Sequence, residues 1–114
     1  ALSLPSMIGF HTAFNNDDNP EFAFAQQVVA FGKPGDILFG ISTSGNSKNV
    51  INATRTAKAL GLVVISLTGE SGGELAPLSD LAILAPANEV PRIQELHLPI
   101  YHALCQVVED TMFP

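Results

Sequence analysis

The sequence predicts an α/β protein with a parallel sheet between two layers of helices, a three-layer α/β/α sandwich. Three short apolar runs, at residues 36–42, 62–68 and 81–84, have the length and composition of buried strands. Amphipathic segments separate the runs, and strands that alternate with helices at this spacing are joined by right-handed crossovers into a parallel sheet. The 114 residues suit a single domain, residues 1–114.

The first third of the chain is predicted to hold one short strand and one helix. Residues 1–5 are expected to form the strand, and the polar run 15–19 a turn. A helix is expected after Asn19, because Asn caps helices and Pro20 suits the first helical position. Gly32 ends this helix. Its apolar stripe consists of Phe24, Val28 and Phe31.

The remaining helices follow from the spacing of apolar residues. One helix is predicted from about Val50 to Gly61, and a long one from Pro91 to about Met112. Pro99 is expected to kink the long helix, because proline lacks the backbone N–H that a helix interior uses. A short helical piece is expected before the third strand.

Composition excludes several classes of protein. With 46% hydrophobic and 14% charged residues, the chain can bury a core and is not disordered. Its net charge of −6 disfavours a nucleic-acid-binding surface. No apolar run reaches the roughly 18 residues of a membrane span, so no membrane contact is expected. The single cysteine, Cys105, allows no internal disulfide and no cysteine-rich zinc site, which predicts a reducing compartment, the cytoplasm.

The loop at residues 42–47 is the strongest candidate site. It follows a predicted buried strand and leads into a helix, and ligands of open parallel sheets bind at that position. Its four hydroxyls belong to Ser42, Thr43, Ser44 and Ser47. Unpaired amides at the start of a helix favour an anion. The loop is therefore either a set of helix caps or a cradle for the phosphate of a small metabolite.

Two further polar clusters are candidates. Gln94 and His102 are eight residues apart, about 12 Å along a helix and about 80° around it, which favours a single catalytic histidine over joint metal ligation. His97 is interpreted as a structural histidine, at the surface or hydrogen-bonded. Asn16 and Asp17 are first of all turn residues, and alternatively contacts for sugar hydroxyls.

Several segments together form a specific pattern. They are Gly40–Ser47, Leu67–Gly69, Gly72-Gly73 and Arg92–His97, followed by His102. On these segments the chain resembles the sugar isomerase (SIS) domain family, and most closely its phosphoheptose isomerase branch. The resemblance covers nearly all 114 residues and implies an SIS-type, flavodoxin/Rossmann-like fold. It corresponds to the later three fifths of a family chain, so the N-terminal portion of the domain is expected to be lacking.

The resemblance implies an enzyme, an intramolecular oxidoreductase that interconverts sedoheptulose 7-phosphate and D-glycero-D-manno-heptose 7-phosphate through an enediol for lipopolysaccharide synthesis. It implies that the phosphate is held by Ser42, Thr43, Ser44 and Ser47, and that the sugar is contacted by Asn16, Asp17 and Gln94. Gln94 and His102 would act at the reacting carbons and bind zinc, with His102 as general acid or base. The family's proton-abstracting Glu has no counterpart here, so these residues alone are expected to bind weakly and not to turn over.

The resemblance also implies a homo-oligomer, a tetramer with sites at subunit boundaries. The alternative function is a non-catalytic SIS protein that binds the bacterial replication initiator, or a phosphosugar-sensing regulatory module. His102 and Ser44 favour the enzyme, because the replication-binding branch tends to lack this histidine and to carry a basic residue at the position of Ser44. Pro91 stands where the phosphoheptose branch often has a polar contact, which leaves the exact sugar open.

Overall fold

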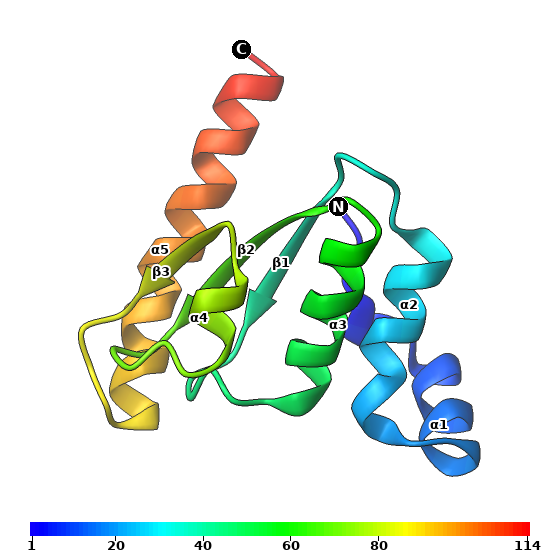
Figure 1. Ribbon diagram of the computed structural model, residues 1–114. Helices are drawn as coiled ribbons and strands as arrows, with labels where there is room; N and C mark the ends of the chain where they lie inside the picture. Colours follow the sequence, from blue (N-terminus) through cyan, green and yellow to red (C-terminus); the bar gives the residue numbers. More distant parts are fainter.

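A three-stranded parallel sheet organises the molecule (Figure 1), a computed structural model that describes residues 1–114. Its strands are β1 (Ile37–Ile41), β2 (Val63–Thr68) and β3 (Leu81–Leu84), in the order β1-β2-β3. The helices are α1 (Ile8–Asp17), α2 (Ala23–Phe31), α3 (Lys48–Ala59), α4 (Leu75–Leu78) and α5 (Val90–Met112), with 3-10 turns η1 (Leu4–Ser6) and η2 (Pro20–Phe22). The three strands predicted at residues 36–42, 62–68 and 81–84 are thus found within a residue of their predicted bounds.

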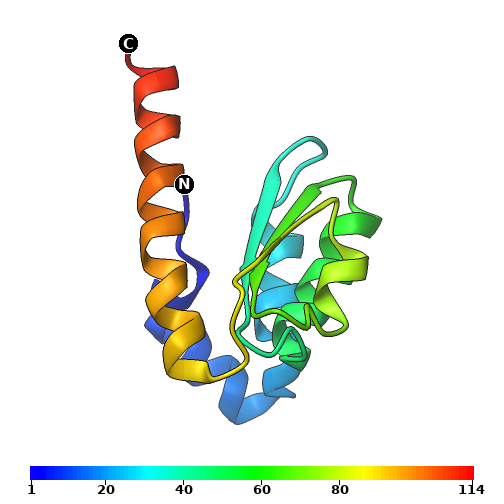
Figure 2. The same ribbon diagram turned by 90° about the vertical axis from the view of Figure 1, so that its left-hand side faces the viewer.

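The helices lie on both sides of the sheet, which confirms the three-layer prediction. Figure 2 shows α2, α3 and α4 on one side and α5 on the other. The buried core lies between the sheet and the first of these layers. Its members are Val28, Ala53, Ala57, Leu62 and Val64. Small alanines on α3 let this helix approach both α2 and the sheet closely.

The sheet face opposite this core is largely open at β1. Ile37, Phe39 and Ile41 point to that face and are 62%, 37% and 47% exposed. The prediction that this strand is buried on both faces is therefore wrong. The physical reason is that β1 is an edge strand with β2 as its sole partner, and α5 does not pack over it. A mainly apolar cleft of about 720 Å³ runs between β1 and the first residues of the chain.

The long helix α5 is attached to the sheet by its first half. Ile93 and His97 are its buried residues, and Nε2 of His97 donates a hydrogen bond to the carbonyl oxygen of Thr68 (2.9 Å). The interpretation of His97 as a hydrogen-bonded structural histidine is thereby confirmed. The helix continues unbroken through Pro99, and its second half extends past the sheet with all residues from Tyr101 onward exposed (Figures 1 and 2).

The N-terminal residues depart from the predictions. Instead of a strand over residues 1–5, the chain forms η1, because Pro5 has no N–H for a sheet ladder and its fixed φ suits a helical turn. Of the polar run 15–19, residues 15–17 are helical rather than in a turn, and Asp18 and Asn19 are extended. None of the α1 residues is buried. The sequence therefore has no apolar stripe from which this helix could have been predicted. Phe10 and Phe14 stack at 5.2 Å along it.

Local capping signals were more reliable. The side chain of Asn19 accepts a hydrogen bond from the backbone N–H of Glu21 (3.0 Å), as its capping role predicts. At the other end of the segment, the N–H of Gly32 closes α2 on the carbonyl oxygen of Val28 (2.8 Å). None of the helices is both long enough and apolar enough to cross a membrane.

Asp80, at the start of β3, joins α3 to the sheet and gives a pH-dependent prediction. Its carboxylate accepts hydrogen bonds from Lys58 and from the backbone N–H of Val64, and these donors hold its pKa below the ordinary value of 3.8. The resulting stability is therefore present above pH 3.8 and is lost as the pH falls through the lower pKa of the folded state. Asp80→Asn should lower the urea concentration at the midpoint of unfolding at pH 7, and the decrease should be smaller at pH 3. An equal difference at both pH values would contradict this.

Candidate functional site

Three loops meet at the carboxyl edge of the sheet. They are residues 42–47 after β1, residues 69–74 after β2 and residues 85–89 after β3. The middle loop is hydrogen-bonded to both neighbours. The N–H of Gly69 donates to the carbonyl oxygen of Thr43 (2.9 Å), and the N–H of Glu70 donates to the carbonyl oxygen of Ala87 (3.0 Å). The three loops therefore form one connected backbone frame, as expected for ligand sites in open parallel sheets.

A cavity of about 240 Å³ lies within this frame. The first loop contributes Thr43, Ser44 and Asn46, the second Gly69, Glu70 and Ser71, the third Ala87 and Asn88, and α5 contributes Val90 and Ile93. No lysine or arginine is among these residues. Any anion bound here would be held by hydroxyls and amides rather than by a cationic side chain.

Backbone hydrogen bonds hold the first loop in a tight turn. Gly45 has φ +67°, and its N–H donates to the carbonyl oxygen of Ser42 (3.1 Å). The N–H of Asn46 donates to the hydroxyl oxygen of Ser44 (3.1 Å). Two further bonds join this loop to the one after β2: the N–H of Glu74 donates to the side chain of Asn46 (2.9 Å), and the N–H of Leu75 to the carbonyl oxygen of Gly45 (2.9 Å). The hydroxyls are thus presented on a fixed backbone.

The four hydroxyls predicted to hold phosphate divide into two pairs. Thr43 and Ser44 line the cavity. Ser42 is buried, and its hydroxyl is hydrogen-bonded to that of Ser47 (2.9 Å). Ser47 is the residue before α3 and makes no side-chain cap. The N–H of Val50 donates to the side chain of Asn49 (2.9 Å), so only the N–H groups of Lys48 and Asn49 at the start of this 12-residue helix are left for another acceptor. Hydroxyls, free amides and a helix start together suit an anion such as a phosphate group.

Gln94 and His102 both lie on the exposed surface of α5. Gln94 follows Ile93, which lines the cavity, whereas His102 is nine residues beyond Ile93, or about 14 Å along the helix axis. The chain therefore does not bring His102 to this cavity. No group of three or more His, Cys, Asp and Glu side chains is placed to hold a metal ion. Two donors are fewer than the four that zinc usually takes, so this chain alone does not form a complete zinc site.

Asn16 and Asp17 lie at the C-terminal end of α1, outside the cavity lining. Both are exposed, and the side-chain amide of Asn16 donates to the carboxylate of Asp17 (2.8 Å). Downstream, Glu21 connects this region to α3: its carboxylate lies 4.0 Å from Lys48, and its carbonyl oxygen accepts from the side chain of Asn52 (3.0 Å). The end of α1 is therefore fixed near the start of α3, at the same end of the molecule as the loops (Figure 1).

Sequence reasoning missed the polar residues that the second and third loops bring to the cavity. Glu70 and Asn88 line it, and the Asn88 side-chain amide donates to a carboxylate oxygen of Glu70 (2.8 Å). A signal was available, because both residues follow predicted strands at their carboxyl ends, as the loop 42–47 does. The residue types alone gave no indication, since Glu and Asn are common in surface loops.

Comparison with known proteins gives consistent relatives. The family described as SIS domain matches residues 1–69. The phosphoheptose isomerase of Helicobacter pylori (strain Shi470) is 50% identical over 109 residues, which cover 96% of this chain and 57% of that protein. The phosphoheptose isomerase of Crocosphaera subtropica is 50% identical over 113 residues, which cover 99% of this chain and 58% of that protein.

Solved structures agree. The phosphoheptose isomerase of Neisseria gonorrhoeae superposes with a TM-score of 0.91 at 40% identity, covering 95% of this chain and 61% of that one. The structure of a phosphoheptose isomerase from Francisella tularensis superposes with a TM-score of 0.92 at 37% identity. The match covers 96% of this chain and 59% of that chain. The chain spans about three fifths of the length of these relatives. With the family match over more than half of its residues, the chain belongs to the SIS domain family.

Proposed function

We propose that the protein is a phosphosugar aldose–ketose isomerase that interconverts sedoheptulose 7-phosphate and D-glycero-D-manno-heptose 7-phosphate in the cytoplasm, for lipopolysaccharide synthesis. The relatives named phosphoheptose isomerase support this choice of reaction. The observation that carries it in this chain is the cavity lined by Thr43 and Ser44, which belong to the hydroxyl-rich loop that leads into α3. The replication-binding alternative has no such support among these relatives.

The loop 42–47 and the start of α3 would hold the phosphate end of the substrate. Phosphate oxygens are acceptors, and this wall of the cavity offers Thr43 and Ser44, whose hydroxyls can donate. The loop then leads into α3, where the N–H groups of Lys48 and Asn49 have no acceptor within the chain. Ser42 and Ser47, whose hydroxyls bond to each other, would keep the turn in shape or rotate toward the phosphate when it binds.

Isomerisation requires a proton to leave one carbon and return to its neighbour while the oxygens exchange a proton. In the proposal, His102 gives and takes the proton at the oxygens, since a neutral imidazole can do both near neutral pH. Gln94 would orient the same part of the sugar. Because His102 is about 14 Å along α5 from Ile93, we place it in a site completed by a second subunit.

Zinc ligation by Gln94 and His102 is part of the proposal, with further donors from outside these residues. The imidazole is a usual zinc donor, whereas an amide oxygen is a weak one. Bound zinc would polarise the carbonyl group. A zinc titration by calorimetry tests this without any activity assay: His102→Ala should lower zinc affinity at least tenfold, while His11→Ala should not. Equal zinc affinity in both variants would contradict the ligand assignment.

We propose a homotetramer, supported by the apolar side chains that α5 leaves exposed. Val107, Val108 and Met112 are 61%, 59% and 67% exposed, and Leu104 is 37% exposed. Apolar surface of this extent on one helix is typical of a protein interface. Light scattering after gel filtration should give about four times the chain mass of 12.0 kDa. The mass of a single chain would contradict the tetramer.

A substitution in the first loop tests the phosphate cradle. Ser44→Arg should place a long side chain into a cavity of only about 240 Å³ and lower the affinity for sedoheptulose 7-phosphate by about tenfold or more. Ser44→Ala, the control, removes one hydroxyl and should cost only a few-fold. Calorimetry measures both. Unchanged affinity in the arginine variant would show that the anion binds elsewhere.

The reaction itself is tested with the gene product that contains these 114 residues. Sedoheptulose 7-phosphate isomerisation is measured before and after chelator treatment, and again after zinc is returned. Turnover that the chelator removes and zinc restores supports both the reaction and the metal. Saturable binding of the sugar phosphate without turnover would favour the non-catalytic binding module instead.

A further inference from the structure

Glu70 and Asn88 form a polar pair that the phosphate-binding proposal leaves without a role. Asn88 donates through its side-chain amide to one carboxylate oxygen of Glu70 (2.8 Å), and both residues line the cavity. The backbone N–H of Glu70 is also fixed, by the carbonyl oxygen of Ala87 (3.0 Å). The second carboxylate oxygen of Glu70 and the amide oxygen of Asn88 have no hydrogen-bond partner within the chain. The pair therefore offers two free acceptors at a defined place.

The walls of the cavity differ in chemistry. The loop after β1, which leads into α3, supplies donors, the hydroxyls of Thr43 and Ser44. The loops after β2 and β3 supply the acceptors of Glu70 and Asn88, next to one further hydroxyl, that of Ser71. The sheet order β1-β2-β3 puts the β1 and β3 loops on opposite sides of the middle one. A ligand with an anionic end and a hydroxyl-bearing end would match this division, because a carboxylate repels a phosphate but accepts hydrogen bonds from hydroxyls.

We propose that Glu70 and Asn88 bind neighbouring hydroxyl groups of the sugar and so select a polyhydroxylated phosphate ester over smaller phosphates. Glu70 accepts from one hydroxyl and Asn88 from the next, while their mutual hydrogen bond keeps the two acceptors in register. This inference rests on the proposed function, because it assigns the far end of the same ligand. Both residues are substrate-selecting rather than proton-transferring.

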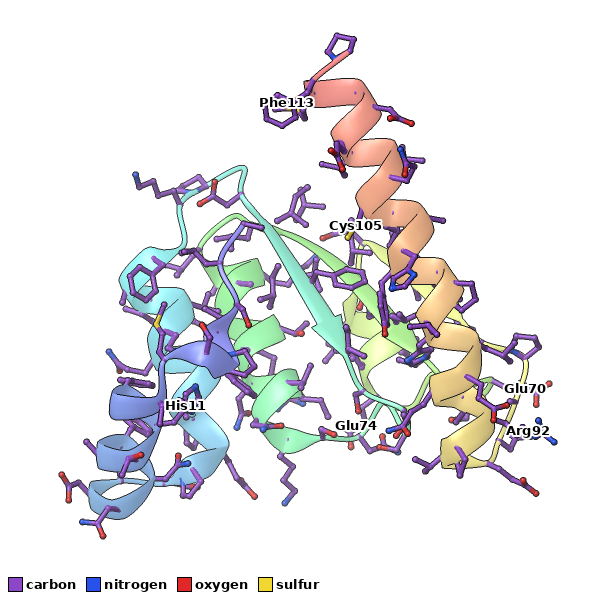
Figure 3. All side chains as sticks on the ribbon, turned by 180° about the vertical axis from the view of Figure 1, so that it is seen from behind. His11, Glu70, Glu74, Arg92, Cys105 and Phe113 are labelled. Atoms are coloured by element: carbon purple, nitrogen blue, oxygen red, sulfur yellow. The ribbon has the colours of Figure 1, made fainter.

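The test uses the gene product that contains these 114 residues and compares two ligands by calorimetry, sedoheptulose 7-phosphate and inorganic phosphate. Glu70→Gln keeps the size of the side chain and can still accept from Asn88, so the loops stay joined. Loss of a charged acceptor should weaken sedoheptulose 7-phosphate binding about tenfold, with inorganic phosphate changed less than about twofold. The matched control is Glu74→Gln in the same loop. Glu74 pairs with Arg55 (3.7 Å), lies outside the cavity lining and is well separated from Glu70 in Figure 3.

Each outcome decides something different. A tenfold loss for the sugar phosphate alone, absent in the Glu74 variant, supports the pair as a sugar contact. If Glu70→Gln strengthens binding of both ligands, its carboxylate faces the phosphate and the inference is overturned. If neither affinity changes, the pair is only a connection between loops, and the inference is again overturned. If the unaltered protein binds neither ligand, the proposed function fails first.

Discussion

Gly45→Ala is expected to destabilise the protein by about 3 kcal/mol or more and to abolish phosphate binding. A Cβ at this position would lie 2.1 Å from the carbonyl oxygen of Gly72 and 2.9 Å from the backbone nitrogen of Gly73. These are backbone atoms and cannot rotate away. Gly45 also has φ +67°, which L residues adopt at a cost. The loop after β1 and the loop after β2 would have to separate, and the cavity would lose its shape.

Gly35→Ala is the matched control, because Gly35 has φ +88° but nothing within 4 Å of an added Cβ. It should cost about 1–2 kcal/mol from the backbone conformation alone, and leave ligand affinity unchanged. Urea unfolding gives the stabilities, and calorimetry with inorganic phosphate gives the binding. Equal stability of the two variants would mean that the close packing of the glycine loops is not what holds the cavity together.

His102→Ala is expected to lower the turnover of sedoheptulose 7-phosphate by at least about 100-fold, because it removes the proposed proton carrier. The side chain is exposed, so the free energy of unfolding should change by no more than about 0.5 kcal/mol. His97→Gln should behave in the opposite way. His97 is buried and bonded to β2, so that variant should lose stability while its remaining folded fraction keeps turning over.

The assay uses the gene product that contains these residues, with unfolding followed by circular dichroism in parallel. Near-normal turnover by His102→Ala would remove this histidine from the mechanism. Loss of fold in that variant would show that the second half of α5 is stabilised by contacts that the single chain does not display.

Local signals predicted most of the fold. The strand 81–84 and the Asn19 cap were correct because apolar runs and capping side chains act over a few residues. Burial was harder to predict. Ile37, Phe39 and Ile41 read as a strand covered on both faces, yet one face is open, because cover depends on which distant segment packs there. Helix α1 was missed because none of its residues is buried in the core, so it carries no apolar stripe.

The candidate site was predictable in part. The loop 42–47 could be found because strand, hydroxyl-rich loop and helix follow one another directly in sequence. Glu70 and Asn88 were missed because their meeting depends on how the loops after β2 and β3 are arranged, which residue types do not indicate. The assignments of Asn16, Gln94 and His102 came from resemblance to a family, and they stay predictions until tested in solution.

An NMR titration with sedoheptulose 7-phosphate tests the central claim most directly, because it locates the ligand on the chain. If the loop 42–47 is the phosphate cradle, the largest amide shifts should occur between Thr43 and Lys48, at the start of α3, and the next largest at Glu70. Inorganic phosphate should shift the amides between Thr43 and Lys48 without shifting that of Glu70. Saturable shifts confined to the apolar cleft along β1, or no shift at the loop at saturating ligand, would contradict the claim that this loop binds the substrate phosphate.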